Sequence, residues 1–223
     1  MISPIYWHPY VYELAMRLLY RARYRERIQA VAALIPEGAR VADVCAGDCS
    51  LYRYGLRDKS VTYTAYDRNP VFVRWARRRG MAMERLDLWD QEIPAADCVV
   101  MMGSLYQFIP RHTGILDKLI RAARRRVIVN EPVMNLAQSP HAWIRRAAWL
   151  LSDAGRESSR HRFTEGELRS LLESRGFCSL ALIAGGRDLV AVRDRDREGR
   201  LPAANPRERR QKSGPDALRR TVW

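Results

Sequence analysis

Two short apolar runs, each ending at polar residues, constrain the fold of this chain most strongly. The first covers residues 40–45 and leads into a turn of small residues that contains Gly47, and the second covers residues 61–66 and ends at Asp67. Runs of this length that are bounded by turn residues and followed by helical patterns are typical of buried parallel strands. The sequence therefore predicts an α/β domain built on a parallel sheet.

Both of these predicted strands carry an aspartate near the carboxyl end. The two residues, Asp43 and Asp67, are 24 positions apart, close to the roughly 20 residues that one strand–helix–strand unit needs in nucleoside-binding folds. A turn of small residues lets a ligand approach the backbone, and an acidic residue at the next strand tip can accept hydrogen bonds from both hydroxyls of a ribose. This spacing predicts a nucleoside-binding site.

The rest of the chain continues the alternation of helices and strands. We expect a helix over 10–35, one that begins near residues 48–50, and helices over 71–79, 112–124 and 165–174. The last of these should start at a capping box formed by Thr164 and Glu167. After the first two strands, further strands are expected over 81–86, 98–102 and 126–130. Two final strands flank Ala184-Gly185-Gly186-Arg187, which is a typical hairpin turn. The pattern predicts a mostly parallel, seven-stranded sheet that ends in an antiparallel hairpin.

Changes in composition divide the chain. Residues 1–39 form an N-terminal helical segment, and residues 40–193 carry the alternating pattern of the main domain. Residues 136–162 interrupt that pattern with a tryptophan-bearing amphipathic helix, which we interpret as an inserted lid. Residues 194–223 are rich in charge, proline and glycine, so we expect a disordered basic tail.

The charge of the chain leaves a second class of substrate open. The 39 Lys and Arg residues outnumber the 25 Asp and Glu residues, which gives a formal net charge of +14. A basic chain can bind nucleic acid. However, almost all of these cations are arginines and they are spread along the sequence, so a nucleic-acid substrate is the alternative and not the first interpretation.

The sequence predicts neither a membrane span nor a metal site. No run of about 18 uncharged apolar residues is present, and the chain does not begin with the pattern of a secretion signal. The cysteines lack zinc-ligand spacing; they are Cys45, Cys49, Cys98 and Cys178. We expect a cytoplasmic protein with free thiols.

Taken in order, these signals resemble those of the class I S-adenosylmethionine-dependent methyltransferases. That family has a loop of the form acidic-x-Gly-x-Gly-x-Gly, and here the loop is Asp43-Val44-Cys45-Ala46-Gly47-Asp48-Cys49, with cysteine in place of two glycines. The resemblance covers roughly residues 28–193. It implies a Rossmann-like three-layer sandwich and S-adenosylmethionine as the cofactor.

The resemblance also implies which residues contact the cofactor. They are Asp43, Cys45, Ala46, Gly47, Asp67, Arg68, Asp87, Leu88 and Met102. In this interpretation Asp67 holds the ribose, Asp87 lies near the adenine and Asp43 helps to hold the methionine amino group. The alternative for Asp67 is a turn-forming role, for Asp87 a solvated one, and for Asp43 the capping of nearby backbone N–H groups.

A second set of candidates faces the methyl acceptor. Substrate contacts are expected from Tyr10, Tyr106, Gln107, Trp143 and Arg146, and possible bases are Tyr106, Glu131 and His161. The N-terminal aromatic cluster around Tyr10 and the inserted helix would cover the pocket and exclude water. For the aromatic residues the alternative is ordinary packing, and for His161 it is a surface position.

The predicted reaction is methyl transfer to oxygen or nitrogen of a small-molecule or lipid-linked acceptor. Such an in-line displacement needs aligned reactants in a dry pocket, with a base only when the acceptor must lose a proton. Three alternative functions remain. A nucleic-acid methyltransferase would carry an Asn/Asp-Pro-Pro-aromatic motif, and a nicotinamide oxidoreductase would carry Gly-x-Gly-x-x-Gly; this sequence has neither motif at the expected position. The third alternative is a membrane-surface protein that binds through its N-terminal helix.

Overall fold

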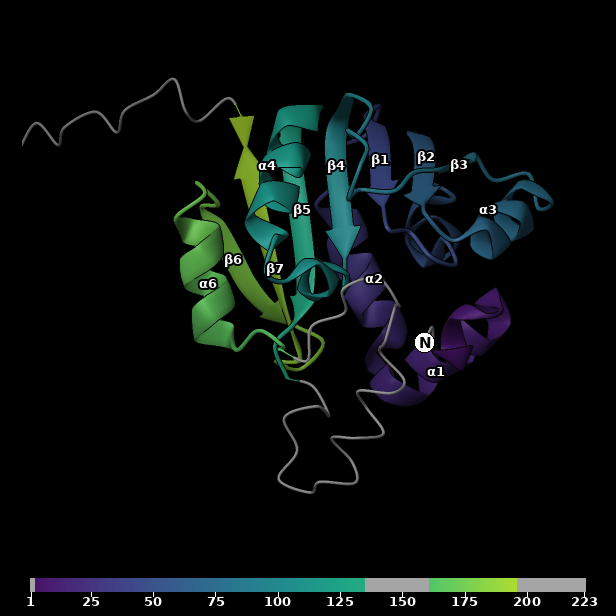
Figure 1. Ribbon diagram of the computed structural model, residues 1–223, viewed down its shortest axis with the longest axis horizontal. Helices are drawn as coiled ribbons and strands as arrows, with labels where there is room; N and C mark the ends of the chain where they lie inside the picture. Colours follow the sequence, from purple (N-terminus) through teal and green to yellow (C-terminus); the bar gives the residue numbers. More distant parts are fainter. Residues whose placement is uncertain (1–2, 135–160, 196–223) are drawn as a thin grey trace, which may run out of the picture.

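A seven-stranded sheet forms the centre of the computed structural model, which describes residues 3–134 and 161–195 (Figure 1). The strand order is β3-β2-β1-β4-β5-β7-β6. The first five of these strands are parallel, and β7 pairs antiparallel with both β5 and β6. The strands are β1 (Arg40–Val44), β2 (Thr62–Asp67), β3 (Met83–Arg85), β4 (Ala96–Met102), β5 (Ala123–Pro132), β6 (Ser179–Ile183) and β7 (Asp188–Asp194). The predicted fold class is confirmed.

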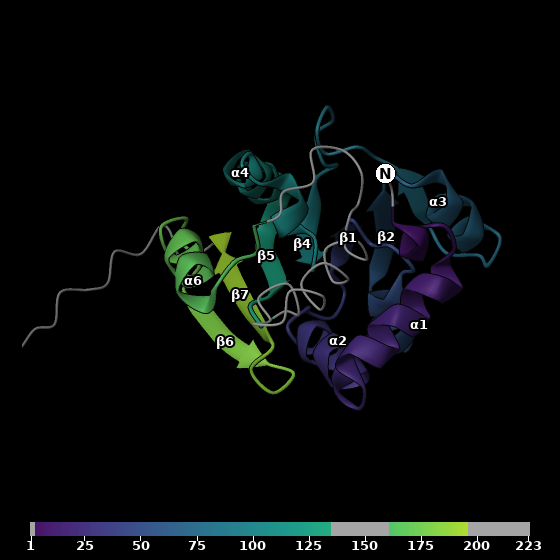
Figure 2. The same cartoon turned by 60° about the horizontal axis from the view of Figure 1, so that its bottom comes forward.

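Helices cover both faces of the sheet and complete a three-layer arrangement (Figures 1 and 2). One face carries α1 (Pro9–Tyr20), α2 (Arg23–Ala33), the π-helical η2 (Tyr52–Leu56) and α3 (Pro70–Arg77). The other carries the 3₁₀ turn η3 (Leu105–Phe108), α4 (His112–Ala122) and α6 (Glu165–Glu173). A further 3₁₀ turn, η1 (Pro4–Tyr6), precedes α1.

The central strands are apolar along their length because each face has its own core. In β1, Ala42 and Val44 pack into the core beneath α4 and α6, whereas Val41 packs into the core beneath α2 and α3. A strand covered on both faces has no solvent-facing side, so its sequence does not alternate between polar and apolar residues. This is why the run over residues 40–45 marks a parallel strand.

The N-terminal segment differs from the single helix predicted over residues 10–35. Arg21 adopts a left-handed conformation with φ 50°, and the chain turns there between α1 and α2. The break lets α2 pack on the sheet while α1 crosses to contact α3. Helical periodicity is similar on both sides of the break, so the pattern alone does not reveal it.

The ends of several other elements also differ from the prediction. A helical segment begins at Ser50, within the expected 48–50, and leads into the π-helical η2. Strand β5 continues beyond its predicted end, through Glu131 and Pro132. Pro132 pairs with Asp188 at the last position of the β5–β7 ladder, where the missing N–H of proline interrupts no central ladder. The capping box of Thr164 and Glu167 at the start of α6 is present as predicted.

The described part of the chain contains neither a membrane-spanning helix nor a cluster of metal-binding side chains. Within residues 3–134 and 161–195, no helix has the length and apolar character needed to cross a membrane. The same residues hold no cluster of three or more His, Cys, Asp or Glu side chains suited to a metal ion. Of the lid predicted over 136–162, residues 136–160 with Trp143 and Arg146 lie outside the described residues, as does the tail predicted over 194–223 from residue 196 onward.

Candidate active site

A cavity of about 580 Å³ lies at the carboxyl ends of β1, β2 and β3. It lies beside the point where the strand order reverses, between β1 and β4, and open α/β sheets bind ligands at this point. Six of the nine residues predicted to contact a cofactor line the cavity, namely Cys45, Gly47, Asp67, Arg68, Asp87 and Leu88. The tertiary structure thus brings together residues from three successive strand ends.

The loop after β1 keeps a glycine-type backbone although only one of its three glycine positions holds glycine. Cys45, Gly47 and Cys49 have φ values of 57°, 54° and 55°. Left-handed conformations are uncommon for residues with a Cβ atom. The repeated left-handed turns keep the backbone of the loop close to the cavity in the way that a glycine-rich loop does.

Asp67 connects the end of β2 to this loop. Its Oδ2 accepts a hydrogen bond from the Gly47 N–H at 2.9 Å, and its Oδ1 accepts one from the Asn69 N–H at 2.8 Å. Burial raises the pKa of the Asp67 carboxyl. The side chain therefore forms the turn expected of an aspartate at this position and also lines the cavity, so the two interpretations of Asp67 are compatible.

The part of the cavity wall formed by the residues that follow β3 combines one carboxylate with an apolar surface. Asp87 Oδ1 accepts a hydrogen bond from the Trp89 N–H at 3.1 Å, and Leu88 is buried. Trp89 packs against Phe108 with ring centroids 5.3 Å apart, and both rings line the cavity. This part of the cavity suits a flat, largely apolar group.

Three residues predicted to contact the cofactor do not line the cavity: Asp43, Ala46 and Met102. The buried Asp43 carboxylate accepts a hydrogen bond from the Tyr63 hydroxyl at 2.7 Å, and burial raises its pKa to about 7. Its side chain points to the same face of the sheet as Val41, because alternate residues of β1 share a face. In this structure Asp43 is therefore held by Tyr63 of β2 and is not part of the cavity wall.

The N-terminal segment supplies a wall of aromatic side chains. Tyr6, Trp7 and Tyr12 line the cavity, and a Cβ atom added to Gly47 would lie 3.5 Å from Cε1 of Tyr12. The sequence singled out the cluster that contains Tyr6 and Trp7 but not Tyr12. No local pattern marks Tyr12, because its contact with the loop depends on the path of α1 across the sheet.

Tyr10, predicted to contact the substrate, points elsewhere. Its side chain is 52% exposed, its ring packs edge-on against Trp75 at 5.9 Å, and its hydroxyl accepts a hydrogen bond from Arg79. It does not line the cavity. Helical geometry explains the difference, because Tyr10 and Tyr12 lie on different sides of α1.

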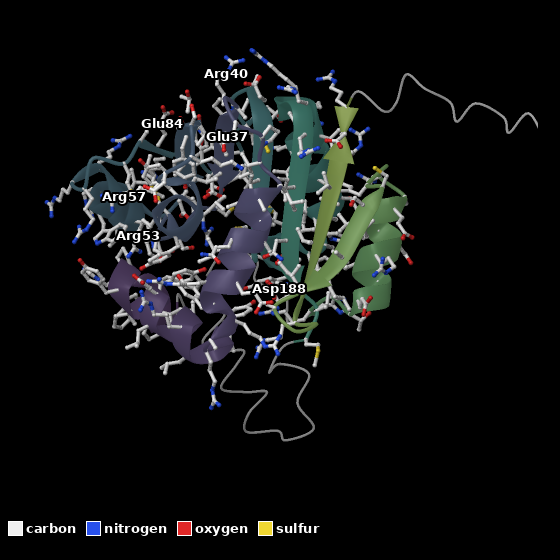
Figure 3. All side chains as sticks on the ribbon, turned by 180° about the vertical axis from the view of Figure 1, so that it is seen from behind. Glu37, Arg40, Arg53, Arg57, Glu84 and Asp188 are labelled. Carbon is white, nitrogen blue, oxygen red and sulfur yellow. The ribbon has the colours of Figure 1, made fainter. Side chains whose placement is uncertain are left out.

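An ionic cluster fastens α1 to the segment after the loop. The buried Glu13 accepts hydrogen bonds from Tyr54 and, at 2.9 Å, from Arg53, which is labelled in Figure 3. The Arg53 guanidinium also pairs with Asp48 at 3.2 Å. Burial raises the pKa of Asp48 to about 6. Burial alone would also raise the pKa of Glu13, but its bonds with Tyr54 and Arg53 lower it. The cluster holds the aromatic wall in place.

The candidate bases lie in different environments. Tyr106 is buried, with the Arg162 guanidinium 4.1 Å from its ring centroid, and burial raises its pKa. His161 is half exposed and its Nε2 lies 3.5 Å from Glu167. Neither side chain lines the cavity, whereas the neighbouring Gln107 does.

Glu131 is the most unusual of these groups. It is completely buried at the end of β5, and its Oε2 accepts a hydrogen bond from the Leu105 N–H at 2.5 Å. Its Oε1 has no hydrogen-bond partner among the described residues. Burial raises its pKa to about 8. Like His161 and Tyr106, Glu131 is not part of the cavity wall.

A buried ion pair lies beside this carboxyl and was missed by sequence reasoning. Asp188, labelled in Figure 3, accepts hydrogen bonds from the Arg27 guanidinium and, at 2.8 Å, from the Tyr20 hydroxyl. The Arg27 guanidinium also donates to Asn130 Oδ1 at 3.1 Å. These residues come from α1, α2, β5 and β7. Arginines are so common in this chain that Arg27 does not stand out in the sequence as a buried residue.

Comparisons with known proteins agree with this geometry. The family described as methionine biosynthesis protein MetW matches residues 25–151. A comparison with curated protein sequences gives no match.

Several solved structures share the fold at low sequence identity. A putative methyltransferase bound to the Haloferax volcanii Trm112 activator has TM-score 0.62 and 14% identity, over 86% of this chain and 97% of that one. Magnesium protoporphyrin IX methyltransferase of Synechocystis PCC 6803, with bound SAH, has TM-score 0.57 and 18% identity, over 78% and 84%. The [4+2]-cyclase SpnF has TM-score 0.55 and 18% identity, over 74% and 61%. These neighbours confirm the expected resemblance in fold to class I methyltransferases.

Proposed function

The chain belongs to the MetW family, and on that premise we propose that it is an S-adenosylmethionine-dependent methyltransferase acting on oxygen or nitrogen of a small-molecule or lipid-linked acceptor. The observation that carries the proposal is the cavity at the ends of β1, β2 and β3. A left-handed loop, a carboxylate and an apolar aromatic wall meet there in the order that an adenosine requires. When bound, the cofactor supplies a methyl group that its positively charged sulfur activates for transfer.

Asp67 and the residues after β3 account for the adenosine. Each Asp67 oxygen accepts one backbone hydrogen bond, and a carboxylate has further lone pairs with which to accept ribose hydroxyls. Leu88 and Trp89 give the adenine ring an apolar surface, with Asp87 at its edge. The backbone of the loop around Gly47 would then lie close to the amino-acid part of the cofactor.

Positioning and water exclusion are the main contributions of the remaining residues. Tyr6, Trp7 and Tyr12 form the wall beside the loop, and the Glu13 cluster keeps α1 fixed in that position. A pocket lined in this way holds two reactants in line and keeps water out. Gln107 also lines the pocket and has donors and an acceptor with which to orient a polar substrate.

None of the three candidate bases lines the cavity, and of the three we favour Glu131 for acceptors that must lose a proton. A raised pKa makes a carboxylate a stronger base once it is ionised, and its Oε1 has no partner among the described residues. His161 is exposed to solvent beside Glu167. Burial makes the Tyr106 hydroxyl difficult to ionise.

Isothermal titration calorimetry with S-adenosylhomocysteine tests the cofactor assignment. We expect Asp67→Ala to weaken binding about 10- to 100-fold, because hydrogen bonds to a charged group contribute about 1.5–3 kcal/mol each. Asp58→Ala is the matched control, because Asp58 is exposed and does not line the cavity. Unchanged affinity in Asp67→Ala would remove the ribose assignment.

A ribose-modified ligand separates direct contact from a structural effect. The wild-type protein should bind the 2′-deoxy form of S-adenosylhomocysteine more weakly than the parent compound, and Asp67→Ala should bind both equally weakly. If Asp67→Ala still discriminates between the two ligands, Asp67 only organises the Gly47 loop. If neither ligand binds the wild-type protein, the proposed function itself is wrong.

A further inference from the structure

Helix α1 carries a row of exposed apolar side chains on its outer side. Trp7, Val11, Leu14 and Leu18 are 66%, 46%, 58% and 68% exposed. The spacing of Val11, Leu14 and Leu18 by three and four residues places them on one side of α1, and Trp7 lies just before the helix, at the end of η1. We call these four residues the α1 stripe. Large apolar side chains that form a contiguous exposed row mark an interaction surface more often than scattered ones do.

The stripe is presented by a helix whose other sides are firmly held. Glu13 is bonded to Arg53 and Tyr54, and the Tyr20 hydroxyl donates to the buried Asp188. Helix α1 lies at the periphery of the fold in both ribbon views (Figures 1 and 2). The stripe is therefore a fixed outer ridge of the molecule and is not exposed by fraying.

Positive charge borders the stripe. Arg21 and Arg25 are exposed at the end of α1 and the start of α2. Arg79, just after α3, donates to the hydroxyl of Tyr10, and Arg17 is exposed and pairs with Glu13 at 2.7 Å. The only acidic residue within Pro9–Tyr20 is Glu13, which is buried and paired. An apolar row that carries a tryptophan and is flanked by arginines is the pattern of helices that lie in the headgroup region of a bilayer.

We propose that the α1 stripe docks this protein on an anionic lipid surface. The apolar side chains would enter the boundary between headgroups and acyl chains, and the flanking arginines would contact lipid phosphates. A second copy of the chain fits less well, because a two-fold pairing of α1 helices would bring the arginine borders of both copies together. The inference rests on the stripe and its charges and does not depend on the proposed reaction.

The position of Trp7 links this surface to the cavity. Trp7 belongs to the stripe and also lines the cavity. A protein docked through the α1 stripe would therefore have the cavity wall adjacent to the lipid surface. An acceptor attached to a lipid could then approach the cavity without leaving the membrane.

Vesicle flotation of the full-length protein tests the proposal. We expect flotation with vesicles of equal parts phosphatidylglycerol and phosphatidylcholine, and little with phosphatidylcholine alone. Leu14→Ser/Leu18→Ser should lower the partition coefficient at least about tenfold, because each leucine loses the gain from burial. Arg21→Glu/Arg25→Glu should lower it by a similar factor on the anionic vesicles.

Arg124→Glu/Arg125→Glu is the matched control for charge. It makes the same change in net charge at two exposed arginines near the amino end of β5, which is the end of the sheet remote from α1. Its partition should stay within about twofold of wild type, because these arginines lie away from the proposed lipid contact. An unspecific effect of net charge would instead lower the partition of this control as much as that of Arg21→Glu/Arg25→Glu. Circular dichroism and binding of S-adenosylhomocysteine check that each variant is folded.

Three results would overturn the proposal. The wild-type protein would fail to float with anionic vesicles, or both α1 variants would float as wild type does. Alternatively, light scattering would show a dimer that Leu14→Ser/Leu18→Ser converts into a monomer while no variant changes flotation. That last result would assign the stripe to an interface between copies of the chain.

Discussion

The Asp67 carboxylate accepts a hydrogen bond from the backbone N–H of Gly47 at 2.9 Å. This bond ties the tip of β2 to the loop after β1, so that two parts of the cavity wall hold each other in place. It also explains how the loop keeps left-handed turns at Cys45 and Cys49, because a fixed partner holds the backbone in a conformation that cysteine does not favour.

Substitutions at Cys45 should show that the loop favours glycine there. With φ 57°, a side chain at this position costs about 1–2 kcal/mol. We expect Cys45→Gly to be neutral or to raise the free energy of unfolding by up to about 1 kcal/mol, and Cys45→Val to lower it by about 2 kcal/mol. Urea denaturation measures both. A stability for Cys45→Val equal to that of wild type would contradict the left-handed geometry.

Two glycines in helical segments should respond to alanine in opposite directions. A Cβ atom at Gly55 in η2 would lie 2.7 Å from the Ala32 Cβ, whereas at Gly114 in α4 it would meet nothing within 4 Å. We expect Gly55→Ala to destabilise the protein by about 1–3 kcal/mol. Gly114→Ala should stabilise it by about 1 kcal/mol through helix propensity. Thermal and chemical unfolding measure both changes in stability. If both variants became more stable, or both less stable, this prediction would be wrong.

The buried ion pair of Arg27 and Asp188 should be sensitive to the loss of either partner. Side-chain exposures are 8% and 0%, so a single substitution leaves a charge without its partner in the core. Arg27→Met and Asp188→Leu should each cost about 3–5 kcal/mol, and the double variant should cost much less than their sum. A double-mutant cycle in urea measures this coupling. Additive effects would mean that the pair does not act as a unit.

The pH dependence of stability should carry a contribution from Glu131. Burial raises its pKa from 4.5 to about 8, so the folded state favours the protonated carboxyl. The stability that this gives is complete below pH 4.5 and is lost as the pH rises towards 8. The contribution is on the order of a few kcal/mol.

Glu131→Gln isolates this contribution from those of Asp43 and Asp48, whose pKa values are raised in the same direction. Glutamine imitates the protonated carboxyl, so the variant should lose less stability than wild type between pH 5 and 8. Urea unfolding across this range gives the difference. Identical pH profiles would place the titration of Glu131 outside this range. If Glu131 is also the base, the variant should lose methyl transfer while His161→Gln keeps it.

Most of the fold was predictable because its signals are local. The β1 and β2 runs, the hairpin around residues 184–187 and the capping box of Thr164 depend on residues close together in the sequence. The break at Arg21 was not predictable in this way. It is set by the separate surfaces against which α1 and α2 pack, and both helices have the same periodicity.

In the candidate site, too, the residues marked by local signals were predictable and those placed by long-range packing were not. Strand-tip residues such as Asp67 and Asp87 reach the cavity because the carboxyl ends of parallel strands share one edge of the sheet. Tyr10 and Tyr12 are two residues apart, yet only Tyr12 lines the cavity. That choice depends on the rotation and path of α1, which distant contacts such as Glu13 with Arg53 decide.

The sequence by itself determined the order of strands and helices and the acidic residues at the strand tips, because periodicity and turn chemistry act over a few residues. Only the tertiary structure decided that Asp43 bonds to Tyr63 and does not line the cavity, that Arg27 and Asp188 form a buried pair, and that one side of α1 stays exposed. Each of these depends on side chains that are far apart in the chain and meet only when the helices pack on the sheet.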